Sequence, residues 1–323
     1  MTFSTPNIKS VIVKIKTDRP VQKTPYQVKG VLMKNFPNEE IVPMLNGSYR
    51  KKYLYPRIQV KIIDEEILLV GLNQGVDPIL KIQEQIKDLD FGDITFDVLE
   101  KNVSENSEAF LFSSSLYKYK FVSSWVALNS NTSKQFDSKN EEEKLQYLNN
   151  LFAKNIVFIT QDTGFELPKN IYSQIIVSTL KPTNLDQNGW RGFNGEFYTN
   201  LVMPDYIGIG NGITRGYGTI SSIDQVKIGS FDSSEFDKLK LEAENSNFLL
   251  DEGSFTSNLQ EVDILTINKP TPRKKKKQRI SKKKKYTSKQ KTNHAKEEKK
   301  SNEPSKEPVN YNSYEYHKKQ HSI

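Results

Sequence analysis

Runs of β-branched and apolar residues alternate with amphipathic stretches over the first hundred positions of the chain. Helices are expected at 25–36 and 76–88, where apolar residues recur at every third or fourth position. Strands are expected at 10–16, 52–62, 66–71 and 91–99. The order β-α-β-β-α-β is that of a ferredoxin-like unit, a sheet with two helices on one face.

A second and less regular version of this pattern follows a polar stretch at 101–110, which we interpret as a linker. A long helix is expected over 137–158, with Ser138 and Glu141 as its capping box. Strands are expected around it at 116–129, 170–180, 196–203 and 217–223. The chain is therefore predicted to be an α+β protein with two tandem ferredoxin-like units.

Beyond residue 225 the hydrophobic pattern fades and the charge changes twice. Residues 226–268 are acidic, with a short helix expected near 234–244. Residues 269–300 carry 16 Lys and Arg against two Asp and Glu. The net positive charge of this tract is therefore larger than the net charge of +8 of the whole chain. Such a segment cannot bury a core and is expected to be disordered. It favours polyanions and would add non-specific nucleic-acid affinity, although a solvated tail without a specific role is an alternative.

The composition excludes several kinds of chemistry. There is no cysteine, which excludes disulfides, cysteine-ligated metals and cysteine nucleophiles. No signal-peptide pattern occurs, nor an apolar run of the roughly 18 residues that a membrane span needs. We expect a soluble cytoplasmic protein whose parts are two ferredoxin-like units, an acidic segment and a lysine-rich tail, at 1–103, 108–225, 226–268 and 269–323.

Five glycines lie within residues 206–218, YIGIGNGITRGYG. Glycine permits positive φ and close approach of other groups, and successive N–H groups in such a segment can form a nest for phosphate. Thr214 and Arg215 would add a hydroxyl and a guanidinium. The segment does not match a Rossmann fingerprint, because the third glycine of that motif is missing. It does not match a Walker loop either, because Gly-Lys-Ser/Thr is absent. A glycine-rich turn without a ligand is the alternative.

This segment resembles the C-terminal glycine-rich loop of the CRISPR precursor-RNA-processing endoribonucleases, in the RAMP superfamily. Gly208-Ile209-Gly210 and Gly216-Tyr217-Gly218 match the two halves of that loop, with Arg215 just ahead of the second half. Three other stretches resemble the same family in the same order: YLYPRIQVK at 53–61, YKFVSSWVALN at 119–129 and FNGEFYTNLVMPDYIG at 193–208.

The resemblance implies a two-unit ferredoxin-like protein that binds CRISPR repeat RNA and cuts precursor transcripts without a metal or other cofactor. The ribose 2′-hydroxyl attacks the adjacent phosphate and leaves a 2′,3′-cyclic phosphate, which requires a base, an acid and positive charge. An alternative is an RNA-binding subunit that does not cut and whose partners are subunits of a CRISPR effector complex. A third possibility is a general nucleic-acid-binding protein that depends on the lysine tail. No membrane partner is implied.

The resemblance places a catalytic histidine just before the Tyr-Pro strand, but residues 43–56 contain none. The only histidines of the chain are His294, His317 and His321, all in the predicted tail. The residues that cluster where the histidine would lie are therefore the catalytic candidates: Tyr49, Lys51 and Lys52. Arg215 and Tyr217 are an alternative pair.

Candidate RNA-binding residues come from two regions. Along 53–61, polar and basic residues alternate with apolar ones, so one face of this strand is expected to be basic and open to RNA or solvent. The candidates are Arg50, Tyr53, Arg57, Gln59 and Lys61 from this region, and Gly208, Gly210, Gly212, Thr214, Arg215, Gly216, Tyr217 and Gly218 from the glycine segment. Trp125 and Trp190 are both assigned to the core, and Asp205 is expected to bridge to Arg215.

Overall fold

The computed structural model describes residues 7–167, 171–185, 189–223 and 254–262. The helix predicted near 234–244, the lysine tract and all three histidines lie outside the described residues.

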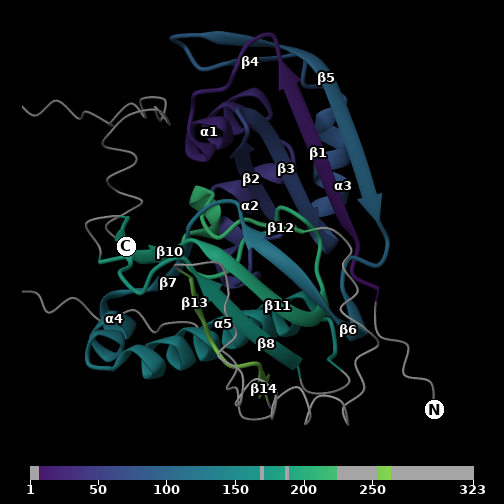
Figure 1. The fold of residues 1–323 in the computed structure, drawn as a ribbon. Coiled ribbons are helices and arrows are strands. Elements are labelled where there is room, and N and C mark those ends of the chain that lie inside the picture. The colour runs from purple at the N-terminus through teal and green to yellow at the C-terminus, as the bar shows by residue number, and fades with distance from the viewer. Residues whose placement is uncertain (1–6, 168–170, 186–188, 224–253, 263–323) are drawn as a thin grey trace, which may run out of the picture. The chain divides into compact units, whose positions relative to one another are not determined.

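The N-terminal half is an antiparallel sheet in the order β2-β3-β1-β5-β4 (Figure 1). Its strands are β1 Ser10–Thr17, β2 Ile58–Ile63, β3 Glu66–Leu72, β4 Asp88–Asp90 and β5 Thr95–Asn106. Its helices are α1 Pro25–Asn35, α2 Ile41–Leu45 and α3 Val76–Gln83, with 3-10 turns η1 Ser48–Lys51 and η2 Asn73–Gly75. With β1 between β3 and β5, the predicted ferredoxin-like fold is confirmed for this half.

Helix α1 begins where the sequence signals it. Thr24 and Gln27 form a reciprocal capping box, and Pro25 occupies the first turn, where its missing N–H costs no hydrogen bond. The apolar side of α1 packs with α3 against one face of the sheet, so Leu32, Ile79 and Val13 share one buried cluster.

The stretch predicted as a linker, 101–110, is largely strand. Strand β5 runs to Asn106 and pairs with the whole of β1, from Val98 opposite Thr17 to Asn106 opposite Ser10. Most of its side chains are exposed, and their polarity hides a strand that pairs with β1 as far as Asn106. Strand β2 also starts at Ile58, six residues later than predicted, because residues 52–57 follow the 3-10 turn Ser48–Lys51 as turns and irregular chain.

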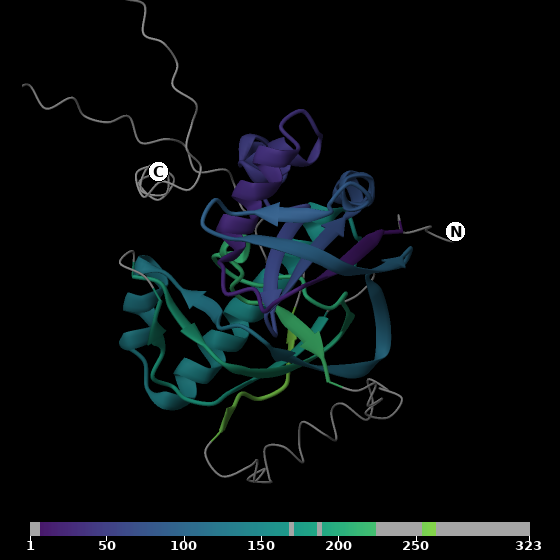
Figure 2. The same ribbon diagram turned by 90° about the horizontal axis from the view of Figure 1, so that it is seen from above.

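The C-terminal half has a sheet in the order β12-β6-β11-β8-β13, and a smaller one in the order β7-β10-β9. The strands are β6 Leu111–Phe121, β7 Trp125–Leu128, β8 Ile171–Val177, β9 Thr183–Asn184, β10 Arg191–Phe193, β11 Gly195–Val202 and β12 Ile220–Ser222. The helices are α4 Ser130–Asp137 and α5 Glu141–Thr163, with a 3-10 turn η3 at Ile213–Arg215. Helix α5 runs along the larger sheet (Figure 2).

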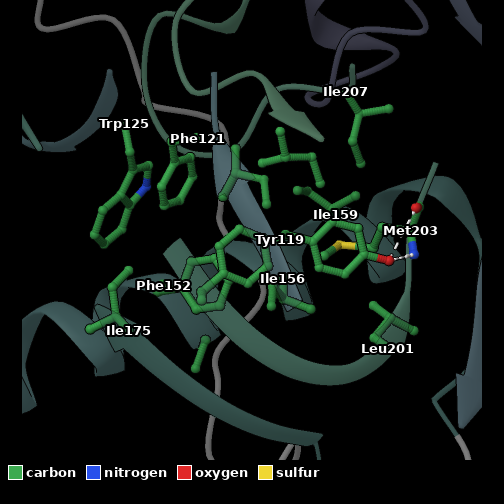
Figure 3. Close-up of a cluster of buried hydrophobic side chains, with 14 of the residues drawn as sticks. Tyr119, Phe121, Trp125, Phe152, Ile156, Ile159, Ile175, Leu201, Met203 and Ile207 are labelled. Carbon is green, nitrogen blue, oxygen red and sulfur yellow. Dashed lines mark hydrogen bonds between the residues drawn. The ribbon is translucent and has the colours of Figure 1, made fainter. Parts of the chain in front are cut away.

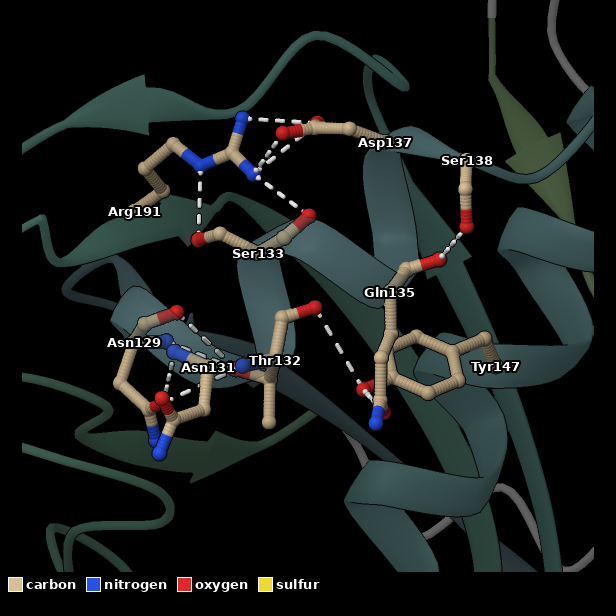
Figure 4. A network of polar contacts seen from close by, with 9 residues as sticks. All are labelled: Asn129, Asn131, Thr132, Ser133, Gln135, Asp137, Ser138, Tyr147 and Arg191. Carbon is tan, nitrogen blue, oxygen red and sulfur yellow. Dashed lines mark hydrogen bonds and ion pairs between the residues drawn. The ribbon is translucent and has the colours of Figure 1, made fainter.

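The predicted long helix is α5, which begins at Glu141 rather than at residue 137 and ends at Thr163 rather than at residue 158, and a separate short helix, α4, precedes it. Asn140, rather than Ser138, caps α5 and makes a capping box with Glu143, while Asn129 caps the separate helix α4. Asp137 is the last residue of α4, and its carboxylate accepts hydrogen bonds from both terminal nitrogens of the Arg191 guanidinium (Figure 4). The Nε of Arg191 also donates to the hydroxyl of Ser133. This pairing ties α4 to β10.

An aromatic cluster fills the space between α5 and the larger sheet (Figure 3). Trp125 stacks on Phe121 with ring centres 5.5 Å apart and planes 4° apart, and Tyr119 stacks on Phe197 at 5.2 Å. The hydroxyl of Tyr119 accepts the N–H of Met203 at 2.9 Å, which explains how a phenol is buried here. Trp125 is fully buried, as predicted.

The compact fold continues beyond residue 225, where the sequence predicted its end. Residues 254–262, called the C-terminal strap below, add β13 Phe255–Thr256 and β14 Gln260–Val262 to the edge of β8. Between these short strands, Ser257 is buried and its hydroxyl accepts the N–H of Ile175 at 3.0 Å. The strap therefore covers an edge that would otherwise present unpaired backbone groups.

Candidate site at the glycine segment

The backbone of the glycine segment 206–218 is held by the protein itself. Hydrogen bonds within the protein are donated by the N–H groups of Tyr206, Gly208, Ile209, Asn211, Arg215, Gly216, Tyr217 and Gly218. Their acceptors are, in the same order, oxygens of Ile220, Gln59, Gly218, Val126, Gly212, Ile213, Gly212 and Ser124. The expectation of an open phosphate nest along the whole segment is therefore wrong, because these donors already have acceptors.

Close packing explains the glycines better than ligand binding does. Gly218 has φ +65°, and a Cβ there would lie 1.9 Å from the carbonyl oxygen of Ile209. At Gly210, with φ +92°, a Cβ would lie 2.8 Å from Nε1 of the core residue Trp125. Any other residue at these positions would clash with neighbours that cannot move away cheaply.

Strand β6 ends where the glycine segment passes it. The hydroxyl of Ser123 donates to the carbonyl oxygen of Gly216 at 2.7 Å, and the carbonyl oxygen of Ser124 accepts the N–H of Gly218 at 2.9 Å. Residues 122–124 thus leave the strand ladder to bind the segment, which is why the strand predicted at 116–129 is divided into β6 and β7.

Side chains around β2 hold the other side of the segment. The hydroxyl of Tyr55 donates to the carbonyl oxygen of Gly208 at 2.9 Å, and Gln59 Oε1 accepts the N–H of Gly208 at 2.8 Å. Tyr55 is fully buried, and this burial raises the pKa of its hydroxyl. The N-terminal half therefore fixes the position of a loop that belongs to the C-terminal half.

Two buried lysines reach the same loop from the N-terminal half. Lys61 Nζ lies 3.3 Å from the carbonyl oxygen of Ile213, and Lys29 Nζ donates to that of Thr214. Burial lowers the pKa of Lys61 to about 7, with a further contribution from Lys29. Burial, with a smaller contribution from Arg215, lowers the pKa of Lys29 to about 8. Three basic side chains thus gather around the turn 213–216, and burial makes the two lysines lose their protons more readily than exposed lysines do.

Arg57 joins the two halves through an ion pair. Its Nη1 lies 2.8 Å from Oδ2 of Asp162 near the end of α5, and the same carboxylate oxygen accepts the N–H of Tyr55 at 3.0 Å. The exposed fractions of Arg57, Gln59 and Lys61 are 5%, 1% and 0%. The expectation that these three form an open RNA-binding face is wrong: they alternate along the strand because they point at the glycine segment and α5.

The catalytic candidates lie on the surface beside this buried network. Lys52 Nζ lies 5.2 Å from the ring centre of Tyr49 and 5.1 Å from that of Tyr53, and the two rings meet edge to face at 6.1 Å. A hydrogen bond with Tyr53 raises the pKa of Lys52. The Arg57 guanidinium lies 4.8 Å from the centre of the Tyr53 ring. Arg50 and Lys51 are exposed in the turn η1.

Trp190 does not belong to the core, contrary to prediction. It is half-buried, and the Arg215 guanidinium lies 4.4 Å from its ring centre. Tyr217 is also half-buried, and Thr214 is exposed. Asp205 accepts the N–H of Ser222 at 2.6 Å and so closes the base of the segment.

Several residues that build this site were not predicted. Lys29, Ser123 and Asp162 each hold the segment or the strand that supports it. Lys29 had a signal in the sequence, because it lies between Val28 and Val31 on the apolar side of α1. None of the helices in the described part of the chain is long and apolar enough to cross a membrane.

Comparison with known proteins identifies both halves. The model of the Cas6b N-terminal domain matches residues 6–109, and that of the Cas6b C-terminal domain matches 111–223. A crystal structure of Cas6b is 26% identical, covers 67% of this chain and all of that one, and has a TM-score of 0.57. A crystal structure of the CRISPR RNA processing endoribonuclease Cas6b is 24% identical with the same coverage and a TM-score of 0.49.

An uncharacterized protein of Methanocaldococcus jannaschii is 24% identical over 140 residues, which are 43% of this chain and 95% of that protein. The two domain models together match more than half of the chain, and the predicted resemblance to the RAMP-type CRISPR RNA-processing proteins is confirmed. The chain therefore belongs to the Cas6b family.

Proposed function

We propose that this protein binds CRISPR repeat RNA and cuts precursor transcripts within the repeat by metal-independent attack of a ribose 2′-hydroxyl. The observation that carries the proposal is the match of both halves to the domains of Cas6b, a family of CRISPR RNA-processing endoribonucleases. The supporting feature is the concentration of cationic side chains around the glycine segment and the turn η1.

Two surfaces would meet the RNA, and β2 connects them. On one side lie Tyr49, Arg50, Lys51, Lys52 and Tyr53 at the turn η1. On the other side lie the outward residues of the glycine segment, Thr214, Arg215 and Tyr217. Gly208, Gly210, Gly212, Gly216 and Gly218 shape that segment, while Arg57, Gln59 and Lys61 act from below as positioning residues.

In the proposed reaction the 2′-oxygen forms a bond to the adjacent phosphorus, and the bond from phosphorus to the 5′-oxygen breaks. The 2′-hydroxyl loses its proton, and the departing 5′-oxygen gains one. Lys52 is held as a cation between two tyrosine rings, so its role is to stabilise the negative charge that develops on the phosphorane. Tyr49 and Lys51 are exposed beside it and are the candidates for contact with the 2′- and 5′-oxygens.

Rate enhancement would then come from positioning and charge rather than from a histidine base. No histidine occurs before His294 in the sequence. Holding the 2′-oxygen in line with the departing 5′-oxygen accelerates attack without a strong base. Such an enzyme would be slow, which suffices where each RNA is cut once.

The same absence of a histidine favours a second candidate function, an RNA-binding subunit that does not cut. The two candidates agree on the ligand and differ in chemistry. They are separated by the fate of the RNA after it is bound.

The test uses the full chain and labelled repeat RNA from its own locus, in excess EDTA. A matched RNA carries 2′-deoxyribose at the scissile position. A single cut that ends in a 2′,3′-cyclic phosphate, and is missing from the deoxy control, supports the nuclease. Tight binding without cleavage at long times supports the second candidate, and no specific binding of the repeat contradicts both.

A further inference from the structure

Trp190 and Arg215 form a partly exposed pair beside the glycine segment, called the Trp190–Arg215 stack below. The guanidinium carbon of Arg215 lies 4.4 Å from the ring centre of Trp190, a distance at which the two planar groups attract each other. Trp190 precedes the short strand β10, and Arg215 ends the turn η3, so residues distant in the sequence meet here.

The glycine segment leaves room for this indole ring. A Cβ at Gly212 would lie 2.8 Å from the Trp190 ring and 2.8 Å from the Tyr217 ring, so Gly212 lies between two aromatic side chains. Both rings are half-buried, so each retains exposed surface. A glycine at this position allows two aromatic rings to approach one backbone turn.

The backbone beneath the stack is fixed. The N–H groups of Arg215 and Tyr217 both donate to the carbonyl oxygen of Gly212, at 2.8 and 3.3 Å. The carbonyl oxygen of Trp190 accepts the N–H of Leu185 at 2.9 Å. The stack is therefore preorganised, which lowers the entropy cost of binding a flat ligand on it.

The charge around the stack selects the ligand. The buried Lys29 amine donates to the carbonyl oxygen of Thr214, next to Arg215, and the carboxylate of Asp205 is engaged by Ser222. A flat aromatic surface beside a guanidinium and a lysine suits a nucleobase joined to a phosphate more than an apolar peptide.

We infer that the Trp190–Arg215 stack is a nucleobase-binding subsite, on which one unpaired base of the RNA stacks while its phosphate lies near Arg215. This inference rests on the proposed function, since it assigns a contact to the RNA that the protein is proposed to bind. It gives the glycine segment a role in holding a base, in addition to its packing role.

The test exploits the tryptophan content of the chain. There are only two tryptophans, and Trp125 is fully buried in the core. Quenching of intrinsic fluorescence on addition of repeat RNA therefore reports Trp190 in the wild-type protein. The Trp190→Phe variant keeps only Trp125 and is the control. A series of repeat RNAs, each lacking one base, locates the stacked nucleotide.

RNA affinity is measured independently by the anisotropy of labelled repeat RNA. Wild-type fluorescence is expected to fall on saturation, and that of Trp190→Phe to stay unchanged. The Kd of Trp190→Ala for the repeat RNA should be about 5- to 100-fold larger than that of the wild type, the usual effect of losing one base-stacking ring. The Kd of Trp190→Phe should stay close to that of the wild type. One abasic RNA should bind without quenching.

Each failure has a distinct meaning. If RNA binds tightly but the fluorescence and the Trp190→Ala affinity do not change, no base stacks on Trp190 and the inference is overturned while the proposed function stands. If the wild-type protein binds no repeat RNA, the proposed function fails first. Thermal unfolding of Trp190→Ala beside Trp190→Phe shows whether a loss of affinity in Trp190→Ala comes from unfolding, because Trp190→Phe retains an aromatic ring at the same place.

Discussion

Lys52 lies above the rings of Tyr49 and Tyr53. Both rings are within 5.2 Å of its amine, and the hydrogen bond with Tyr53 raises its pKa. A lysine kept in this way carries its charge at any pH near neutrality. It cannot act as a base there, and the role proposed for it is to stabilise negative charge on the phosphorane.

Replacing this charge tests its role at the scissile phosphate. Lys52→Met should lower the single-turnover cleavage rate about 100-fold, with little change in RNA affinity, because the charge acts mainly on the phosphorane. The measurement is cleavage at saturating protein. Lys34→Met is the matched control, since Lys34 is an exposed lysine paired with Asp90 at 3.0 Å. Equal rates in the two variants would remove Lys52 from the mechanism.

Gly218 tests the packing account of the glycine segment. Gly218→Ala should lower the free energy of unfolding by about 3 kcal/mol, because it combines a left-handed backbone with a clash against Ile209. Gly92→Ala is the control: Gly92 has φ +89°, but nothing lies within 4 Å of a Cβ there. It should cost only about 1 kcal/mol. Chemical denaturation of both variants gives the comparison, and equal losses would contradict the packing account.

At the scale of the elements, the sequence predicted the ferredoxin-like order well and its boundaries less well. Strand β5 was missed beyond residue 99 because its side chains are exposed, and only pairing with β1 reveals it. Arg57, Gln59 and Lys61 showed the alternation of a strand, but alternation does not say whether the polar face meets solvent or another part of the chain. Trp190 and Arg215 meet through tertiary contact alone.

The C-terminal strap was not predictable, since β13 and β14 are too short to show a pattern. Ser257→Pro removes the N–H that donates to Ile175 at 2.9 Å, so it should detach the strap locally. We expect about 2 kcal/mol of destabilisation and faster hydrogen exchange in β8. Ser257→Ala loses only the hydroxyl acceptor and should cost less. Unchanged exchange in β8 for Ser257→Pro would show that the strap does not protect this edge.

At the scale of the whole described fold, the glycine segment is an interface between halves rather than an isolated loop. Tyr55, Gln59, Lys61 and Lys29 of the N-terminal half all bind its backbone. Burying lysines at such a junction makes the stability of the protein depend on pH.

The direction of this dependence follows from the lowered pKa of Lys61, about 7, against an ordinary value of 10.5. Between these values the unfolded chain binds a proton that the folded chain does not, so this group makes stability rise with pH and fall as pH approaches 7. One such group contributes up to about 1.4 kcal/mol per pH unit. Urea unfolding of wild type and Lys61→Met at pH 7, 8 and 9 should show a smaller slope in the variant.

Lys34→Met serves again as the control and should keep the wild-type slope. If Lys61→Met also keeps that slope, Lys61 is protonated in the folded protein throughout this range, and its burial does not lower its pKa as argued.

The central claim is that a member of the Cas6b family cuts its RNA without a histidine. The most direct test is single-turnover cleavage of repeat RNA in EDTA by a variant in which His294, His317 and His321 are all replaced by Ala, beside the wild type. The account predicts the same cut, the same 2′,3′-cyclic phosphate end and the same rate within a factor of about two. A rate at least 100-fold lower, restored by returning one histidine, would contradict it and place the catalytic base in the tail.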